Sequence, residues 1–127
     1  MAEQTRPDRP LSPHLTIYRP QMTSMSSILT RITGIALLLG ALLVVAWFLA
    51  AASSPESFAK MDGLMTSWLG DLVMTGSLWA LWYHALAGLR HLYWDTGRGL
   101  ELATANLLGW GLIVGSVVLT ILTIVII

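Results

Sequence analysis

Charged residues are absent from three long stretches of this chain. No Asp, Glu, Lys or Arg occurs in residues 32–55, 72–89 or 102–127, which are 24, 18 and 26 residues long. A helix needs about 20 largely apolar residues to cross the hydrocarbon core of a bilayer. The pattern therefore predicts an all-α membrane protein with three transmembrane helices.

Polar and turn-forming residues set the expected boundaries of these elements. We expect a membrane domain over 23–127, with helices at about 23–52, 63–94 and 103–127. Ser54-Pro55-Glu56 has the order of an N-cap, a proline at the first helical position and an acid in the first turn, which predicts a short helix on the outer surface. Residues 1–22 contain four of the five prolines and predict an extended N-terminal arm.

The composition excludes several classes of protein. Hydrophobic residues make up 55% of the chain and charged residues 11%, whereas a soluble domain has about a quarter charged residues. The net charge is zero, so no basic field favours nucleic acid. The chain has no cysteine and so cannot form a disulfide, a zinc–thiolate site or an iron–sulfur cluster of its own. Its chemistry must rest on a few polar side chains, a bound cofactor or partner subunits.

The basic residues predict the orientation of the chain in the membrane. Six of the seven lie before or early in the first span, or around the second loop: Arg6, Arg9, Arg19, Arg31, Arg90 and Arg98. Only Lys60 lies on the other side. The positive-inside rule places the N-terminus and the 95–101 loop in the cytoplasm and the C-terminus outside. Without a signal or transit-peptide pattern, we expect a bacterial inner membrane rather than a mitochondrial one.

A polar stripe runs along one face of the second span. His84, Gly88, His91 and Asp95 are spaced i, i+4, i+7 and i+11. His84 lies about 16 Å from Asp95 along the helix and hence well inside the membrane. Such a histidine can be hydrogen-bonded and structural, can relay protons or can ligate a metal. A b-type haem needs an apolar slot for its ring and cations near the interface for its propionates, and His91 and the arginines could supply these cations. The residues alone leave the structural, proton-relay and ligand roles of His84 open.

A second polar stripe opens the first span. Ser24, Ser27, Arg31 and Gly34 are spaced i, i+3, i+7 and i+10, again on one face. Taken alone, Arg31 is explained by snorkelling to the headgroups and the serines by helix packing. Because this stripe lies at the same membrane depth as His91, we expect the two polar stripes to form a binding site together. Arg31 would pair with a propionate and Ser27 would hydrogen-bond a quinone carbonyl.

Two motifs resemble the cytochrome b subunit of succinate dehydrogenase, the larger membrane anchor of respiratory complex II. They are Ser27-Ile-Leu-Thr-Arg31-Ile-Thr-Gly34 and His84-Ala-Leu-Ala-Gly88-Leu-Arg90-His91-Leu-Tyr-Trp-Asp95. The arm segment Arg9-Pro-Leu-Ser-Pro-His14-Leu-Thr-Ile-Tyr18 is similar to the version of alphaproteobacteria and mitochondria. The resemblance covers nearly the whole chain.

The resemblance implies a role for each matching residue. His84 would be an axial ligand of haem b, with the other ligand supplied by the small anchor subunit of the same helix bundle. Ser27 and Arg31 would line the ubiquinone pocket, and Arg31 and His91 would lie near the haem propionates. The family often has a histidine where this chain has Thr30, which removes the basis for a propionate role there.

The resemblance also implies partners and leaves two alternatives. The arm would contact a flavoprotein subunit and an iron–sulfur subunit, whose centres carry electrons from succinate to ubiquinone. The chain alone is not expected to be catalytic. A structural anchor without haem would keep the three spans and not need His84. An anchor of a menaquinol-dependent fumarate reductase would use a similar scaffold in the opposite direction.

Overall fold

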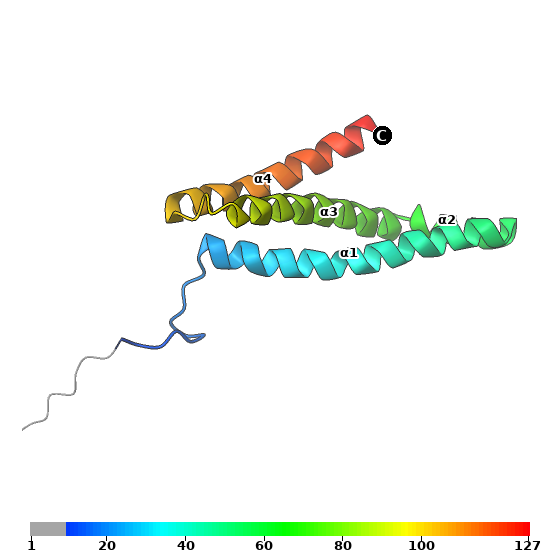
Figure 1. The fold of residues 1–127 in the computed structure, drawn as a ribbon. Helices are drawn as coiled ribbons and strands as arrows, with labels where there is room; N and C mark the ends of the chain where they lie inside the picture. Colours follow the sequence, from blue (N-terminus) through cyan, green and yellow to red (C-terminus); the bar gives the residue numbers. More distant parts are fainter. Residues whose placement is uncertain (1–9) are drawn as a thin grey trace, which may run out of the picture.

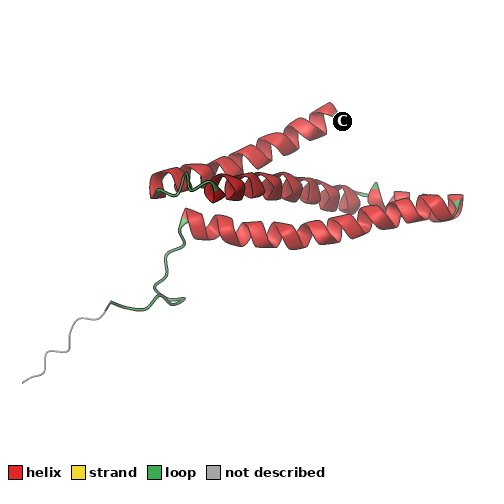
Figure 2. Ribbon diagram, viewed as in Figure 1, coloured by secondary structure: helices red, strands yellow, loops and turns green. Residues whose placement is uncertain are grey.

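The computed structural model describes residues 10–127, which form helices joined by short loops (Figure 2). In chain order the helices are α1 (Met22–Ser53), α2 (Pro55–Met65), α3 (Trp68–Asp95) and α4 (Leu102–Ile126). No strand occurs within this range. α1, α3 and α4 are long and apolar enough to cross a membrane. The predicted all-α membrane protein with three spans is confirmed.

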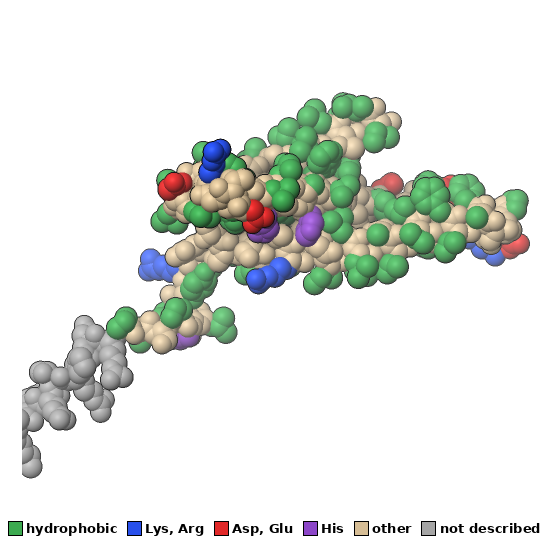
Figure 3. Space-filling model, viewed as in Figure 1, with side chains coloured by type: hydrophobic (Ala, Val, Ile, Leu, Met, Phe, Trp, Pro, Cys, Tyr) green, Lys and Arg blue, Asp and Glu red, His purple; other side chains and the backbone are tan. Residues whose placement is uncertain are grey.

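The three long helices lie side by side, with α3 in the middle (Figure 1). α4 diverges from α3 toward the C-terminus, and the described part of the arm leaves the start of α1. Residues 1–9, including Arg6 and Arg9, lie outside the described residues. Apolar side chains cover much of the outer surface (Figure 3), as expected for helices that face lipid or other helices.

A small core holds α3 against its two neighbours. Tyr83, Ala87 and Leu112 are buried together, and Leu29 of α1 packs against them. The indole nitrogens of Trp79 and Trp82 donate to hydroxyls of α4, at 3.1 and 2.9 Å. In a membrane such bonds satisfy polar groups that lipid cannot.

The short helix expected after Ser54 is α2. The Ser54 hydroxyl accepts a hydrogen bond from the Ser57 amide at 3.1 Å, and Pro55 occupies the first turn. α2 folds back along the end of α1 (Figure 1). The rings of Trp47 and Phe58 stack with centroids 6.2 Å apart, which joins the two helices.

The second span begins later than the sequence pattern predicts. α3 starts at Trp68 rather than near Gly63, because Gly63 belongs to α2 and a corner follows at Thr66 and Ser67. The Ser67 hydroxyl caps α3 by accepting from the Gly70 amide at 3.2 Å. A side chain at position 70 would collide with the Met65 carbonyl, so glycine permits this tight corner.

Candidate functional site

The imidazole of His84 extends from α3 onto the backbone of α1. Its Nδ1 lies 3.1 Å from the Thr30 carbonyl oxygen and 3.3 Å from the Thr33 hydroxyl. A carbonyl can only accept, so Nδ1 carries the proton. The Thr33 hydroxyl donates its own proton to the Leu29 carbonyl at 2.8 Å and remains an acceptor for Nδ1. These contacts assign the lone pair of the imidazole to Nε2.

Nε2 is therefore available to a ligand. Within residues 10–127 no hydrogen bond to this atom is formed, and His84 is half-buried. A metal-ligating histidine usually donates its other ring nitrogen to a carbonyl or carboxylate, which fixes the tautomer and the ring plane. The bond to the Thr30 carbonyl has this form.

Gly34 provides the space into which the imidazole fits. A Cβ on Gly34 would lie 3.1 Å from Cε1 of His84 and 3.6 Å from Nδ1. Contacts between carbon atoms are most favourable at about 3.5–4.0 Å, so an added methyl group would press on the ring. Packing against His84 thus explains why a glycine lies seven residues after Ser27. The same contact places this row of α1 at the boundary with α3.

The other side of the His84 stripe is open. A Cβ on Gly88, one turn from His84, would meet no atom within 4 Å. His91 is exposed, with its ring centroid 5.6 Å from that of Trp94, and Asp95 is exposed as well. Figure 3 shows histidine side chains at the boundary of α1 and α3, with basic and acidic side chains nearby. A flat group has room to approach α3 here.

Ser27 and Arg31 flank this boundary on α1. Arg31 is exposed and Ser27 half-exposed, and both are on the row that contains Gly34. The Ser27 hydroxyl makes no side-chain hydrogen bond within the part of the chain that the structure describes, unlike those of Ser24 and Ser26. The structure brings Gly34 into contact with His84. No hydrogen bond or ion pair links Ser27, Arg31 or His91 to His84 among residues 10–127.

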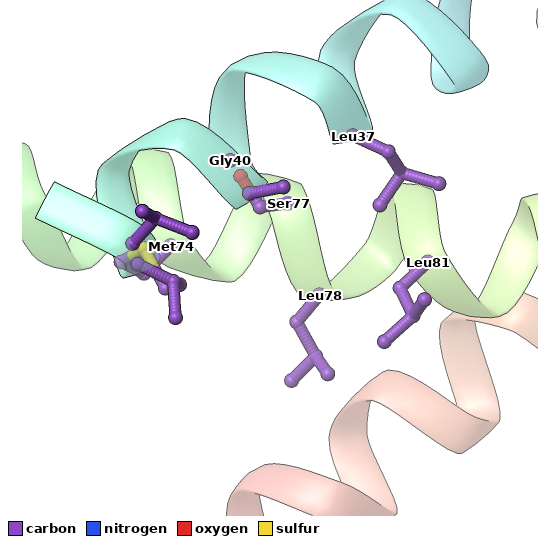
Figure 4. Close-up of a pocket in the computed structure, with 9 residues that line it drawn as sticks. Leu37, Gly40, Met74, Ser77, Leu78 and Leu81 are labelled. Carbon is purple, nitrogen blue, oxygen red and sulfur yellow. The ribbon is translucent and has the colours of Figure 1, made fainter. Parts of the chain in front are cut away.

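An apolar groove continues along the same boundary toward α2. Its volume is about 400 Å³, and Figure 4 shows Gly40 against Ser77 with leucines and a methionine around them. Ser77, Leu81, His84 and Gly88 follow the i, i+4, i+7, i+11 spacing of one helix face. The groove and His84 therefore share the same side of α3.

A buried layer beside the stripe was missed by the sequence analysis. Arg90, expected near the interface, is only 4% exposed, and its Nη1 donates to the Ser26 hydroxyl at 2.9 Å. The Tyr83 hydroxyl donates to the Ser26 carbonyl at 3.1 Å. Ser26, Thr30 and Thr33 are spaced i, i+4 and i+7, so the rule used for the other stripes could have found this one.

The residues present fit one axial position of a haem. Among residues 10–127 no group of three or more His, Cys, Asp or Glu side chains could hold a metal ion. A single imidazole with an oriented, free Nε2 is the protein ligand that a macrocycle-bound iron requires. The open face at Gly88 and the exposed Arg31 and His91 meet the needs of a flat group with acidic substituents.

Comparison with known proteins gives a consistent set of relatives. Residues 5–123 match the family described as succinate dehydrogenase/fumarate reductase transmembrane subunit. The chain is 52% identical to the succinate dehydrogenase cytochrome b556 subunit of Paracoccus denitrificans, over 99% of this chain and 97% of that protein. It is 40% identical to the protein of the same name from Rickettsia bellii, over 90% and 89%. Its identity to the cytochrome b560 subunit of Reclinomonas americana is 39%, over 81% and 75%.

Proposed function

The chain belongs to the succinate dehydrogenase/fumarate reductase transmembrane subunit family, and from this premise we propose that it binds haem b and helps to form a ubiquinone-reduction site. It is a cytochrome b membrane-anchor subunit of succinate dehydrogenase. The observation that carries the proposal is the His84 imidazole, whose Nδ1 is held by the Thr30 carbonyl while Nε2 makes no hydrogen bond within residues 10–127.

His84 is the proposed axial ligand of the haem. The Thr30 carbonyl and the Thr33 hydroxyl hold the ring in one tautomer, and Gly34 lets the ring lie close to α1. Since the described chain supplies one such imidazole, the second ligand is proposed to come from the small anchor subunit. When bound, the haem supplies a one-electron carrier inside the membrane. Arg31 and His91 are proposed to lie near its propionates.

Ser27 and Arg31 are the proposed contacts of ubiquinone. A serine hydroxyl that makes no side-chain bond within residues 10–127 can donate to a quinone carbonyl without breaking an existing contact. The Arg31 guanidinium stabilises the negative charge that develops on a quinone oxygen as it accepts electrons. The exposure of Arg31 supports this proposal, because its guanidinium donates no hydrogen bond and forms no ion pair within residues 10–127.

The remaining redox centres are proposed to lie in other subunits. The chain has no cysteine with which to hold an iron–sulfur cluster. A flavoprotein subunit and an iron–sulfur subunit would oxidise succinate and pass electrons to the quinone. We propose a bacterial inner membrane location, with the arm and the α3–α4 loop on the cytoplasmic side, where the arm contacts these subunits.

The names of the relatives favour succinate oxidation over fumarate reduction. The family description covers both succinate dehydrogenase and fumarate reductase, whereas the relatives named above are succinate dehydrogenase subunits. The free Nε2 of His84 favours a haem-binding anchor over a haem-free one.

The proposed quinone site is tested with Ser27→Ala in the assembled complex. We expect the KM for a short-chain ubiquinone to rise about fivefold to tenfold, the value of one hydrogen bond. Succinate oxidation by an artificial acceptor should be unchanged. Ser53→Ala, at the exposed opposite end of α1, is the matched control. Equal loss in both assays, or an unchanged quinone KM, would contradict the proposal.

A further inference from the structure

Arg90 is a buried cation without an acidic partner among residues 10–127. Its side chain is 4% exposed, and the ion pair found within residues 10–127 is the exposed one between Lys60 and Glu56. Buried charges in proteins are normally paired, because the loss of hydration costs several kcal/mol per ion. Inside a membrane an ionisable residue marks function by default.

Arg90 contacts the first turns of α1 and an aromatic ring of α3. Nη1 donates to the Ser26 hydroxyl at 2.9 Å, and that hydroxyl donates to the Thr23 carbonyl at 3.1 Å. The guanidinium carbon lies 4.6 Å from the centre of the Trp94 ring, a cation–π distance. Nε is buried and has no partner in the described chain. A guanidinium is thus held at this point with only part of its hydrogen bonds formed.

α3 holds Ser26 at two atoms. Arg90 donates to its hydroxyl, and Tyr83 donates to its carbonyl at 3.1 Å. Ser26 is fully buried as a result. Ser27 follows directly in the chain and turns toward the boundary with His84. The position of the Ser27 hydroxyl relative to α3 therefore depends on how Ser26 is held.

We infer that Arg90 is a positioning residue for quinone. Through Ser26 it sets where Ser27 meets the substrate, and its charge, which no acid pairs within residues 10–127, favours electron-rich quinone oxygens at that depth. This inference rests on the proposed quinone site. It assigns to Arg90 an effect on quinone binding that exceeds any effect on succinate oxidation.

Four variants of the assembled complex separate position from charge. Arg90→Met keeps an unbranched apolar stem but removes the guanidinium, with its donors and its charge, and we expect the quinone KM to rise about tenfold. Arg90→Lys keeps a donor and the charge and should restore most of the affinity. Ser26→Ala removes the hydroxyl that accepts from Arg90 and donates to the Thr23 carbonyl, and should raise KM by about threefold to tenfold. Arg98→Met, an exposed cation of the α3–α4 loop, is the control and should leave KM unchanged.

The outcomes distinguish this inference from the proposed site. Artificial-acceptor activity within twofold of wild type shows that each complex has assembled. If Arg90→Met fails to assemble, Ser26→Ala and Arg90→Lys decide. An unchanged quinone KM in Ser26→Ala overturns the inference. A quinone KM more than tenfold above wild type in Arg90→Lys also overturns it. If Ser27→Ala raises KM while Ser26→Ala and Arg90→Met do not, only the inference is wrong. If Ser27→Ala itself has no effect, the quinone site is wrong.

Discussion

Gly34→Ala tests the packing that orients His84. The added methyl group would lie 3.1 Å from Cε1 and 3.9 Å from Nε2 of the imidazole. This is several tenths of an ångström closer than a comfortable carbon contact, so the ring or α1 must move. Overpacking of this kind costs about 1–3 kcal/mol. Alanine gains about 0.5–1 kcal/mol over glycine in helix propensity, which offsets part of that cost.

The displaced ring loses the geometry of its bond to the Thr30 carbonyl, 3.1 Å in the structure. Loss of such an orienting partner weakens metal binding by about 10–100-fold, so we expect haem retention to fall by about tenfold. The assay is haem b per purified complex, from the reduced-minus-oxidised absorption spectrum after a graded detergent wash.

Gly111→Ala is the matched control for this substitution. Gly111 lies in α4, where a Cβ would meet no atom within 4 Å, so the same change should leave haem retention intact. A Gly34→Ala complex that holds haem as tightly as the Gly111→Ala complex would refute the packing argument.

Three further substitutions test contacts around the site and in the α3–α4 loop, each by the thermal unfolding of the purified complex. Tyr83→Phe removes the bond to the Ser26 carbonyl and should cost about 1 kcal/mol, seen as a lower Tm; an unchanged Tm would show that this bond does not join α1 to α3. Gly97 and Gly99 both have positive φ, at 76° and 73°, so alanine at either costs about 1–2 kcal/mol. Gly99→Ala should lower Tm further than Gly97→Ala, because its Cβ would also collide with the Tyr93 ring; the reverse order would contradict the loop geometry.

The three membrane spans could be predicted from the sequence because lipid imposes a strong and simple constraint. A run without charge that is long enough to cross the bilayer has few other uses. α1 and α4 accordingly lie within one residue of the expected bounds. The predicted start of α3 was wrong, because α2 and α3 are both helical and partly apolar and the pattern does not separate them. Their corner depends on the Ser67 cap and on Gly70 against Met65, which periodicity does not reveal.

The candidate site could be predicted only in part. The stripes at His84 and Ser27 follow from helical spacing within one segment. The tautomer of His84 depends on Thr30, which is 54 positions away in the chain, and that contact exists only once α1 and α3 have packed. Helical spacing places Arg90 near the end of the second span but does not reveal its partner. Its contact with Ser26, 64 positions away in the chain, buries it between the helices.

The most direct test of the haem ligand compares the two histidines of α3. His84→Leu and His91→Leu remove imidazoles that are two turns apart on the same face. Of these two, within residues 10–127, only His84 has its Nδ1 held by a backbone carbonyl. The measurement is the reduced-minus-oxidised spectrum of each purified complex beside wild type. We expect the b-type signal to be lost in His84→Leu and kept in His91→Leu. An unchanged b-type signal in His84→Leu would contradict the assignment.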